Sequence, residues 1–292
     1  MINYHTDTSN LKKMSDKEIK ENLTNILISF ASFCEKNNLR YTLAWGTLLG
    51  CIRHEGLIPW DDDVDVIMPR EDYEKLKKLA ESDDYTIEKD YYKLSTPNNK
   101  YSVHMPIYRV IDMRTITDSK KRAKKYWLPL WIDIMPCDHV PNDNAVIKSA
   151  VEKFYKNIAH MSFAIYNSNR SMNIVKRAIG KIEEPFMDHF INKYDQQNTK
   201  LGKETDGYFD FSTEIDRPKD GNFLQYIYDR DIFDTTILKS FEGHKVRAPK
   251  EYDKILTILY GDYMKLPPEN QRVSHSNGAY WLKKGELYGT KH

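Results

Sequence analysis

Four carboxylates stand within one short stretch, Ile-Pro-Trp-Asp-Asp-Asp-Val-Asp-Val, which spans residues 58–66. Side chains alternate between the two faces of a strand, so Asp61, Asp63 and Asp65 would share one face while the two valines face a core. Three like charges on one strand face repel each other, and a divalent cation held by oxygen atoms would relieve that repulsion. A solvated acidic turn is the other interpretation, because aspartate is common in turns and poor in strands.

Two other motifs favour a metal site over an acidic turn. Residues 41–44 have the pattern of a short buried strand, and Gly46 and Thr47 follow it at the start of a helical turn. Such a turn lets the backbone approach a phosphate closely and points amide N–H groups at it. Downstream, Asp133 stands between two isoleucines, where burying a carboxylate is costly unless a partner neutralises it. The cation held by the acidic run could be that partner.

These three motifs, in this order, resemble the signature of the nucleotidyltransferase fold. A longer set resembles the LicD/fukutin family of phosphotransferases: Trp45-Gly46-Thr47-Leu48-Leu49-Gly50, Arg53, Gly56, and Ile58-Pro59-Trp60 with the acids that follow. The C-terminal part adds Phe241-Glu242-Gly243, Val246, Ala248-Pro249, Tyr252-Asp253, Tyr260-Gly261-Asp262-Tyr263 and Pro267-Pro268. The resemblance extends from about residue 41 to about residue 275, and residues 140–240 match only loosely.

The resemblance implies a nucleotidyltransferase-like mixed-sheet core and a metal-dependent transfer reaction. The donor would be CDP-choline or another CDP-alcohol, and phosphocholine or a related phospho-alcohol would pass to a sugar hydroxyl, releasing CMP. The acceptor would be a glycan, or lipid-linked glycan, precursor of a cell-surface polymer of the teichoic acid or lipopolysaccharide type. A nucleotidyltransferase that transfers NMP and releases pyrophosphate is the alternative. A non-catalytic protein with a decayed site is a third possibility, against which the intact acids argue.

Phosphoryl-group transfer needs charge neutralisation, in-line positioning and an activated acceptor oxygen. In the family's pattern, Asp63 and Asp65 are metal ligands, and the expected cofactor is Mg²⁺ or Mn²⁺. Asp133 is expected to bind a second, acceptor-side metal or to act as general base for the acceptor hydroxyl. Asp61 is assigned a helper role beside the pair.

The remaining site residues are expected to bind substrate. Gly46 and Thr47 would hold the diphosphate, and Arg53 could hold a phosphate oxygen. Choline's quaternary ammonium is bound by aromatic rings through cation–π attraction. Aromatic residues that could form such a cage cluster just before Asp133, although core packing is an equally good interpretation of each: Tyr126, Trp127 and Trp131.

Several charged residues are weaker candidates. His54 follows Arg53, and Lys100 and Arg109 flank a predicted strand. Arg272 and His275 could fold back over the site from the C-terminal tail, but a solvated surface position explains each of them as well. Tyr260, Gly261 and Asp262 are interpreted as the end of a helix.

Periodicity predicts an α/β (α+β) fold with flanking helices and a largely helical C-terminal half. Helices are predicted at 15–37, 72–80, 145–164, 174–194 and 249–259, and strands at 41–44, 61–66, 105–113, 131–135, 207–212, 236–241 and 245–248. Ser15 and Glu18 form a capping box, and Glu242-Gly243 would join the last two strands in a hairpin. The chain is expected to divide into a catalytic core at 1–140 and a helical and small-sheet substrate-binding region at 141–292, or to form one continuous domain.

Composition excludes several classes of protein. The chain has 292 residues with a formal net charge of +1, which leaves no broad basic field for nucleic acid. Cys34, Cys51 and Cys137 are scattered and include no CxxC pair, which argues against a disulfide framework or structural zinc. The polar N-terminus lacks the apolar stretch of a signal peptide, and no apolar run is long enough to span a bilayer. A cytoplasmic location, with peripheral contact at the inner membrane face, is therefore expected.

Rival motifs fail at defined positions. An EF-hand loop beginning at Asp61 would need Gly at its sixth position and Glu at its twelfth, where this chain has Val66 and Asp72. The sequence also contains no GxxxxGK[ST], HExxH or GxSxG motif. P-loop, zincin and α/β-hydrolase chemistry therefore find no support.

Overall fold

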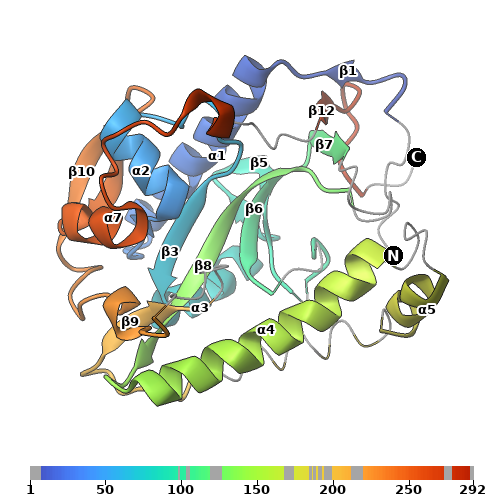
Figure 1. The fold of residues 1–292 in the computed structure, drawn as a ribbon. Coiled ribbons are helices and arrows are strands. Elements are labelled where there is room, and N and C mark those ends of the chain that lie inside the picture. The colour runs from blue at the N-terminus through green and yellow to red at the C-terminus, as the bar shows by residue number, and fades with distance from the viewer. Residues whose placement is uncertain are drawn as a thin grey trace.

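The computed structural model describes residues 8–97, 99–102, 106–118, 127–167, 174–183, 186, 189, 193, 199–211, 220–272 and 278–289. The strands of its central sheet, in spatial order, are β2 (Thr42–Leu43), β3 (Asp65–Pro69), β8 (Leu130–Val140), β6 (Tyr108–Asp112), β5 (Lys89–Ser95) and β4 (Thr86–Ile87). A further strand, β9 (Gly207–Asp210), pairs with the second half of β8 (Figure 1). β3 and β8 are parallel and the other neighbours are antiparallel, so the predicted mixed α/β class is confirmed.

Two helices, α1 (Asp16–Lys36) and α3 (Arg70–Glu81), cover one face of this sheet. Leu27 and Phe30 of α1 are fully buried in one apolar cluster with Val66 of β3. Alternation along β3 sends Val66 into this core and therefore sends Asp65 to the opposite face. The separation of apolar and acidic side chains in the acidic run is thus a property of one strand.

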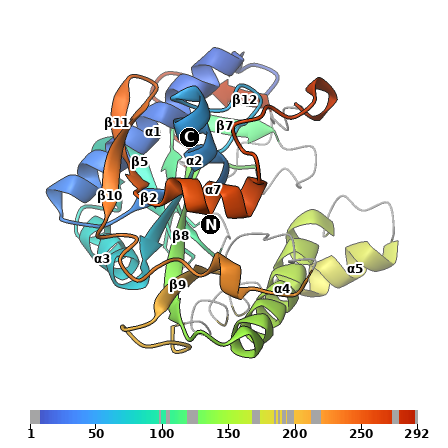
Figure 2. The ribbon, with the colours of Figure 1, turned by 60° about the vertical axis from the view of Figure 1, so that its left-hand side comes forward.

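The opposite face of the sheet carries a smaller apolar cluster. Ile67 of β3 and Met135 of β8 pack there with Phe233, and Ile255 lies against the cluster. Ile255 belongs to α7 (Tyr252–Tyr260), which lies near the short helix η3 (Leu224–Tyr226). α4 (Asn144–Asn167) and α5 (Ile174–Glu183) extend to one side, away from α1 and α3 (Figure 2).

The predicted hairpin is present as β10 (Thr236–Phe241) and β11 (His244–Pro249), which pair over their whole length. Both turn residues have positive φ, 48° at Glu242 and 79° at Gly243, which is the backbone of the two-residue turns that suit hairpins. The Glu242 side chain accepts a hydrogen bond from the Leu57 N–H at 3.0 Å. The hairpin therefore packs beside α2 (Trp45–His54), the helix that follows the glycine motif.

A three-stranded sheet joins distant parts of the chain. It contains β1 (Lys12–Lys13), β12 (Gly278–Trp281) and β7 (Thr115–Asp118), with β12 in the centre. A short helix, η4 (Glu269–Gln271), precedes β12. Within the described part of the chain, none of the helices has the length and apolar character needed to cross a bilayer.

Several local predictions agree with the structure and others do not. The capping box is confirmed, since the Glu18 N–H donates to Ser15 Oγ and the Ser15 N–H donates back to Glu18 Oε2. β3 begins only at Asp65, so the other acids precede the strand that was predicted to contain them. The strand continues to Pro69, which pairs with Cys137. α3 begins at Arg70, two residues before the predicted start.

The second half of the chain mixes helices with strands and is not the largely helical region that was predicted. β9 joins the central sheet, and β10 to β12 pair elsewhere. β10 and β11 form the predicted hairpin, whereas β9 and β12 gain their hydrogen bonds from strands distant in sequence, which local periodicity does not report. The strand predicted at 105–113 is shorter in the structure, where β6 spans Tyr108–Asp112. Residues 105 and 119–126 lie outside the described residues.

Candidate active site

A row of three charged side chains crosses the central sheet. Asp65 on β3 pairs in register with Asp133 on β8, and Asp133 pairs directly with Arg109 on β6. Side chains at directly paired positions lie on the same face and within reach of each other. Asp63 and Asp61 precede the row along the chain, and the Asp133 N–H donates to the Val64 carbonyl oxygen at 2.8 Å. The sheet thus brings together carboxylates that lie about seventy residues apart in sequence.

The acids of this cluster raise one another's pKa. Desolvation, followed by the charges of Asp61, Asp133 and Asp62, raises the pKa of Asp63 to about 8, although much of its side chain remains exposed. Desolvation, followed by Asp63, Asp133 and Asp61, raises the pKa of Asp65 well above its usual range. Both shifts therefore come first from removal of the carboxylates from water and second from the neighbouring negative charges.

The glycine motif lies at the start of α2, next to the acids. The Asp65 N–H donates to Thr47 Oγ1 at 2.8 Å, and Thr47 is almost fully buried. A Cβ atom at Gly46 would lie 2.7 Å from Asp61 Oδ2, so only glycine allows this approach. Trp45 has φ +48°, a conformation that non-glycine residues seldom adopt outside sites with a special role. The first amides of α2 therefore begin beside the carboxylate cluster.

Two side chains hold Asp133 in place. Arg109 Nε donates to Asp133 Oδ1 at 2.5 Å, and Trp131 Nε1 donates to Asp133 Oδ2 at 3.0 Å. The Arg109 guanidinium lies 4.5 Å from the centre of the Trp131 ring, which is a cation–π contact. Arg109 is therefore part of the site and not a flanking surface residue.

Two residues to which the sequence analysis gave no role in the site also lie near the acids. Asp210 ends β9, is buried, and contributes to the raised pKa of Asp65. Trp45 Nε1 donates to Asp210 Oδ2 at 3.3 Å. Tyr260 does end α7, as interpreted from the sequence, but desolvation and the charges of Asp65, Asp61 and Asp63 raise its pKa, so it lies within electrostatic range of the cluster. Asp210 has no local motif, and the motif that contains Tyr260 was interpreted only as the end of a helix. Strand pairing and helix packing bring the two residues towards the acids.

Arg53 binds backbone and not the acid cluster. Its Nη1 donates to the Tyr263 carbonyl oxygen at 2.8 Å, which ties α2 to the segment after α7. Arg272 does fold back, and its guanidinium lies 5.5 Å from the centre of the ring of Trp60, the residue that precedes the acids. His54 is in edge contact with the same ring. Arg272 and His54 therefore lie near the start of the acidic run, through their contacts with Trp60.

The three aromatic candidates have different surroundings. Trp131 is half-buried and contacts Asp133 directly. Trp127 is buried in an apolar cluster with Ile116 and Tyr288, and Trp131 packs against the outside of the same cluster. Tyr126 lies outside the described residues, as does His275. Lys100 pairs with Asp84 in an exposed ion pair and does not join the row of charges.

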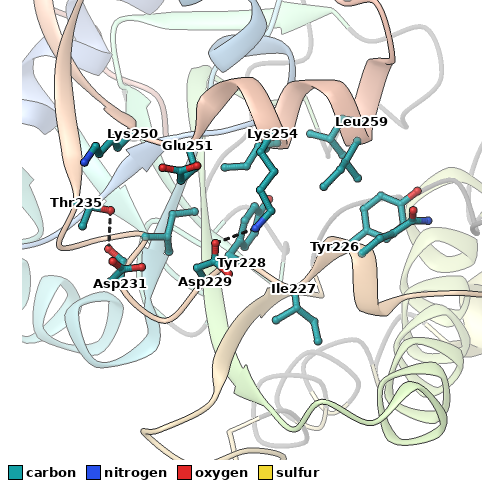
Figure 3. A pocket seen from close by; sticks show the side chains of 14 residues that line it. Tyr226, Ile227, Tyr228, Asp229, Asp231, Thr235, Lys250, Glu251, Lys254 and Leu259 are labelled. Carbon is teal, nitrogen blue, oxygen red and sulfur yellow. Dashed lines mark hydrogen bonds and ion pairs between the residues drawn. The ribbon is translucent and has the colours of Figure 1, made fainter.

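A hollow lies between α7 and the segment from residue 225 to residue 235. Tyr226, Ile227 and Leu259 line it, as do Lys254 and Asp229, which form an ion pair at 2.9 Å (Figure 3). Tyr228 also lines the hollow. Desolvation, followed by Cys137 and Asp210, raises the pKa of Tyr228 well above its usual value, so Tyr228 lies near Asp210. The hollow is therefore a mostly apolar neighbour of the acidic cluster.

A divalent cation would suit the chemistry of this cluster. Asp63 and Asp65 are hard oxygen donors of the type that Mg²⁺ and Mn²⁺ prefer, and a cation would reverse the repulsion that raises their pKa values. Among the described residues, however, no three His, Cys, Asp or Glu side chains already form a group that could hold an ion. Asp133 is instead bound to Arg109.

Comparison with known proteins gives one match over almost the whole chain and two shorter matches. The family model for the LicD/FKTN/FKRP nucleotidyltransferase domain matches residues 38–129, which contain the glycine motif and the acidic run and stop before Asp133. The chain is 30% identical over 287 residues to the lipopolysaccharide cholinephosphotransferase LicD of Haemophilus influenzae, covering 93% of this chain and 100% of that protein. A shorter match is to an uncharacterized protein of Rickettsia prowazekii, with 48% identity over 44 residues. It covers 15% of this chain and 16% of that protein.

Proposed function

The chain belongs to the LicD family of phosphotransferases, and we propose on this premise that it transfers phosphocholine from CDP-choline to a sugar hydroxyl of a cell-surface glycan precursor, releasing CMP. The observation that carries the proposal is the register of Asp65 with Asp133, which joins the acidic run to the lone acid on one sheet face. The relative of full-length similarity is named a cholinephosphotransferase that acts on lipopolysaccharide. Its name supports phosphocholine as the transferred group and a lipopolysaccharide-type glycan as acceptor.

Asp63 and Asp65 are the proposed ligands of Mg²⁺ or Mn²⁺, which would neutralise charge on the donor diphosphate. Gly46 and Thr47, at the start of α2, would direct amide N–H groups at the same phosphates. The Gly46 position also keeps Asp61 close to this end of the helix. These residues would hold the donor with its phosphorus accessible to the acceptor.

Asp133 is the proposed general base. An acceptor hydroxyl oxygen would form a bond to the phosphorus of phosphocholine as the bond to the bridging oxygen of CMP breaks. The hydroxyl proton would pass to the Asp133 carboxylate, which is partly exposed on this face and so can be reached by a sugar. Trp131 Nε1 would keep the other carboxylate oxygen oriented.

Trp131 is the proposed contact for the choline head group. It donates a hydrogen bond to Asp133, whereas Trp127 is buried inside the apolar cluster that Trp131 flanks. A quaternary ammonium binds aromatic faces because it cannot form ordinary hydrogen bonds. A related phospho-alcohol donor, such as CDP-glycerol, would gain less from this ring.

We further propose that the protein works in the cytoplasm beside the inner face of the membrane. A precursor of a surface polymer is assembled there, and a lipid-linked acceptor would bring the enzyme into peripheral contact with the bilayer. The acceptor polymer would be of the lipopolysaccharide or teichoic acid type. Nucleic acid is not an expected partner, given the net charge of +1.

The deciding experiment is product analysis with a panel of CDP-alcohols and Mg²⁺. Release of CMP together with phosphocholine transfer would support the proposal. Release of pyrophosphate from CTP would instead indicate a nucleotidyltransferase of the same family. Asp63→Asn is the matched variant, and unchanged turnover in that variant would contradict the assignment of this site.

A further inference from the structure

We propose that Arg109 binds a non-bridging oxygen of the donor's diphosphate, and so completes the transfer site from the side opposite the metal ligands. This inference rests on the proposed function. It assigns Arg109 a substrate contact in addition to its pairing with Asp133. Three observations carry it.

The first observation is position. Arg109 stands on β6 directly opposite Asp133, which stands directly opposite Asp65 on β3. The row therefore runs from the proposed metal ligand to the proposed base and then to a cation, all on one face. A phosphoryl group held between Asp65 and Asp133 would lie one position from Arg109, whose long side chain could reach it.

The second observation is an unused donor. Arg109 Nε and Nη2 both point at Asp133, at 2.5 Å and 3.4 Å. Arg109 Nη1 is buried and has no hydrogen-bond partner among the residues that the structure describes, and the residue is only 3% exposed. A buried N–H without an acceptor is costly and is therefore rare in folded proteins. A phosphate oxygen would supply the missing acceptor, and with a charge of the right sign.

The third observation is rigidity. Trp131 lies against the guanidinium at 4.5 Å and also donates to Asp133. Arginine stacks on aromatic rings and presents a planar fork of donors, which lysine does not do. The two contacts fix the plane of the guanidinium before substrate arrives, and this is how residues that bind phosphoryl groups are prepared for their task.

A simpler role has to be separated from this one. Arg109 could serve only as the ion-pair partner that holds Asp133 in place. In that case its removal would act through Asp133 alone, and a chain that already lacks the Asp133 charge would not respond to it. A phosphate-binding Arg109 would still contribute in that background. The two roles therefore differ in a double-mutant cycle.

The experiment measures CDP binding by titration calorimetry, with Mg²⁺ present, to the full-length protein. The variants are Arg109→Met, Arg109→Lys, Asp133→Asn and the double variant Arg109→Met/Asp133→Asn. Arg114→Met is the matched control, because Arg114 also donates to an aspartate, Asp112, and stacks on a ring, that of Tyr91, but lies outside the row. Circular dichroism checks that each variant is folded.

We expect Arg109→Met to weaken CDP binding by about tenfold or more, both alone and in the Asp133→Asn background. Arg109→Lys, which keeps a charge for Asp133 but not the free donor, should also bind CDP more weakly, and Arg114→Met should not. A double variant that binds CDP as tightly as Asp133→Asn would overturn the inference, as would wild-type affinity in a folded Arg109→Lys. Failure of the wild-type protein to bind CDP would instead contradict the proposed donor, and the inference with it.

Discussion

The hydroxyl of Thr47 accepts a hydrogen bond from the amide of Asp65 at 2.8 Å. This bond links the glycine motif at the start of α2 to the first residue of β3, and it lies in the buried part of the structure. The proposed phosphate-binding turn and one of the proposed metal ligands are therefore held in a fixed relation by this bond.

Thr47→Val should destabilise the protein and lower its activity. Valine has nearly the same shape as threonine, so no cavity forms, but the buried Asp65 N–H loses its acceptor at a cost of about 1–3 kcal/mol. Urea denaturation measures the stability change, and CMP release measures activity. Thr47→Ser retains the hydroxyl and should fall close to the wild type; if valine and serine behave alike, the hydrogen bond has no role.

Asp65→Asn should abolish turnover yet raise the stability of the metal-free protein. The substitution removes one of the charges whose repulsion raises the pKa values of the cluster, while the loss of a proposed metal ligand should reduce CMP release at least about a hundredfold. Thermal unfolding in EDTA and in Mg²⁺ checks both effects. Mg²⁺ should stabilise the wild type more than the variant, and Asp90→Asn, at an exposed position, serves as the control. A variant less stable than the wild type in EDTA would count against repulsion in the cluster.

Gly46→Ala should impair activity through Asp61. The added Cβ would stand 2.7 Å from Asp61 Oδ2, so the carboxylate or the start of α2 must move. A displacement near 1 Å at a reacting centre can cost about a hundredfold in rate. In an Asp61→Gly background the same substitution should cost little more. Equal losses in both backgrounds would show that the alanine acts elsewhere.

Trp131→Ala should lower the preference for CDP-choline over CDP-glycerol, because the ring is the proposed contact of the trimethylammonium group. The overall rate should fall for both donors, since Trp131 also holds Asp133. The ratio of the two kcat/KM values isolates the effect on choline. Trp127→Leu, inside the buried cluster that Trp131 flanks, should reduce stability while leaving that ratio unchanged. An unchanged ratio in Trp131→Ala would remove Trp131 from choline recognition.

Asp72 should make the fold sensitive to acid. Burial opposes its ionisation, but hydrogen bonds from Arg40 and Lys75 outweigh burial and lower the pKa of Asp72 below its usual value. A carboxyl group with a lowered pKa stabilises the folded state above its unfolded pKa, about 3.9, and this contribution is lost as the pH falls through the folded pKa. The stability difference between the wild type and Asp72→Asn should thus be largest near pH 6 and shrink towards pH 3 in urea titrations. A difference independent of pH would mean that the ion pair contributes nothing through ionisation.

The sequence identified the parts of the site that are local in the chain. The acidic run, the glycine turn and the lone Asp133 were visible as motifs because each depends on a few neighbouring residues whose spacing matches an element. The capping box at Ser15 and the hairpin turn at Glu242-Gly243 were predictable for the same reason. The family also followed from such motifs, and the full-length similarity to a cholinephosphotransferase confirms it.

Only the tertiary structure decided which of these residues meet. Strand register placed Asp133 between Asp65 and Arg109, and register depends on pairing between strands that are distant in sequence. Asp210 and Tyr260 reach the acids through a strand pairing and a helix packing that no local pattern encodes. Trp127 and Trp131, four residues apart, differ in surroundings because one is buried in a core and the other faces the row of charges. A sequence shows which groups are available, whereas their distances and partners are set by long-range packing.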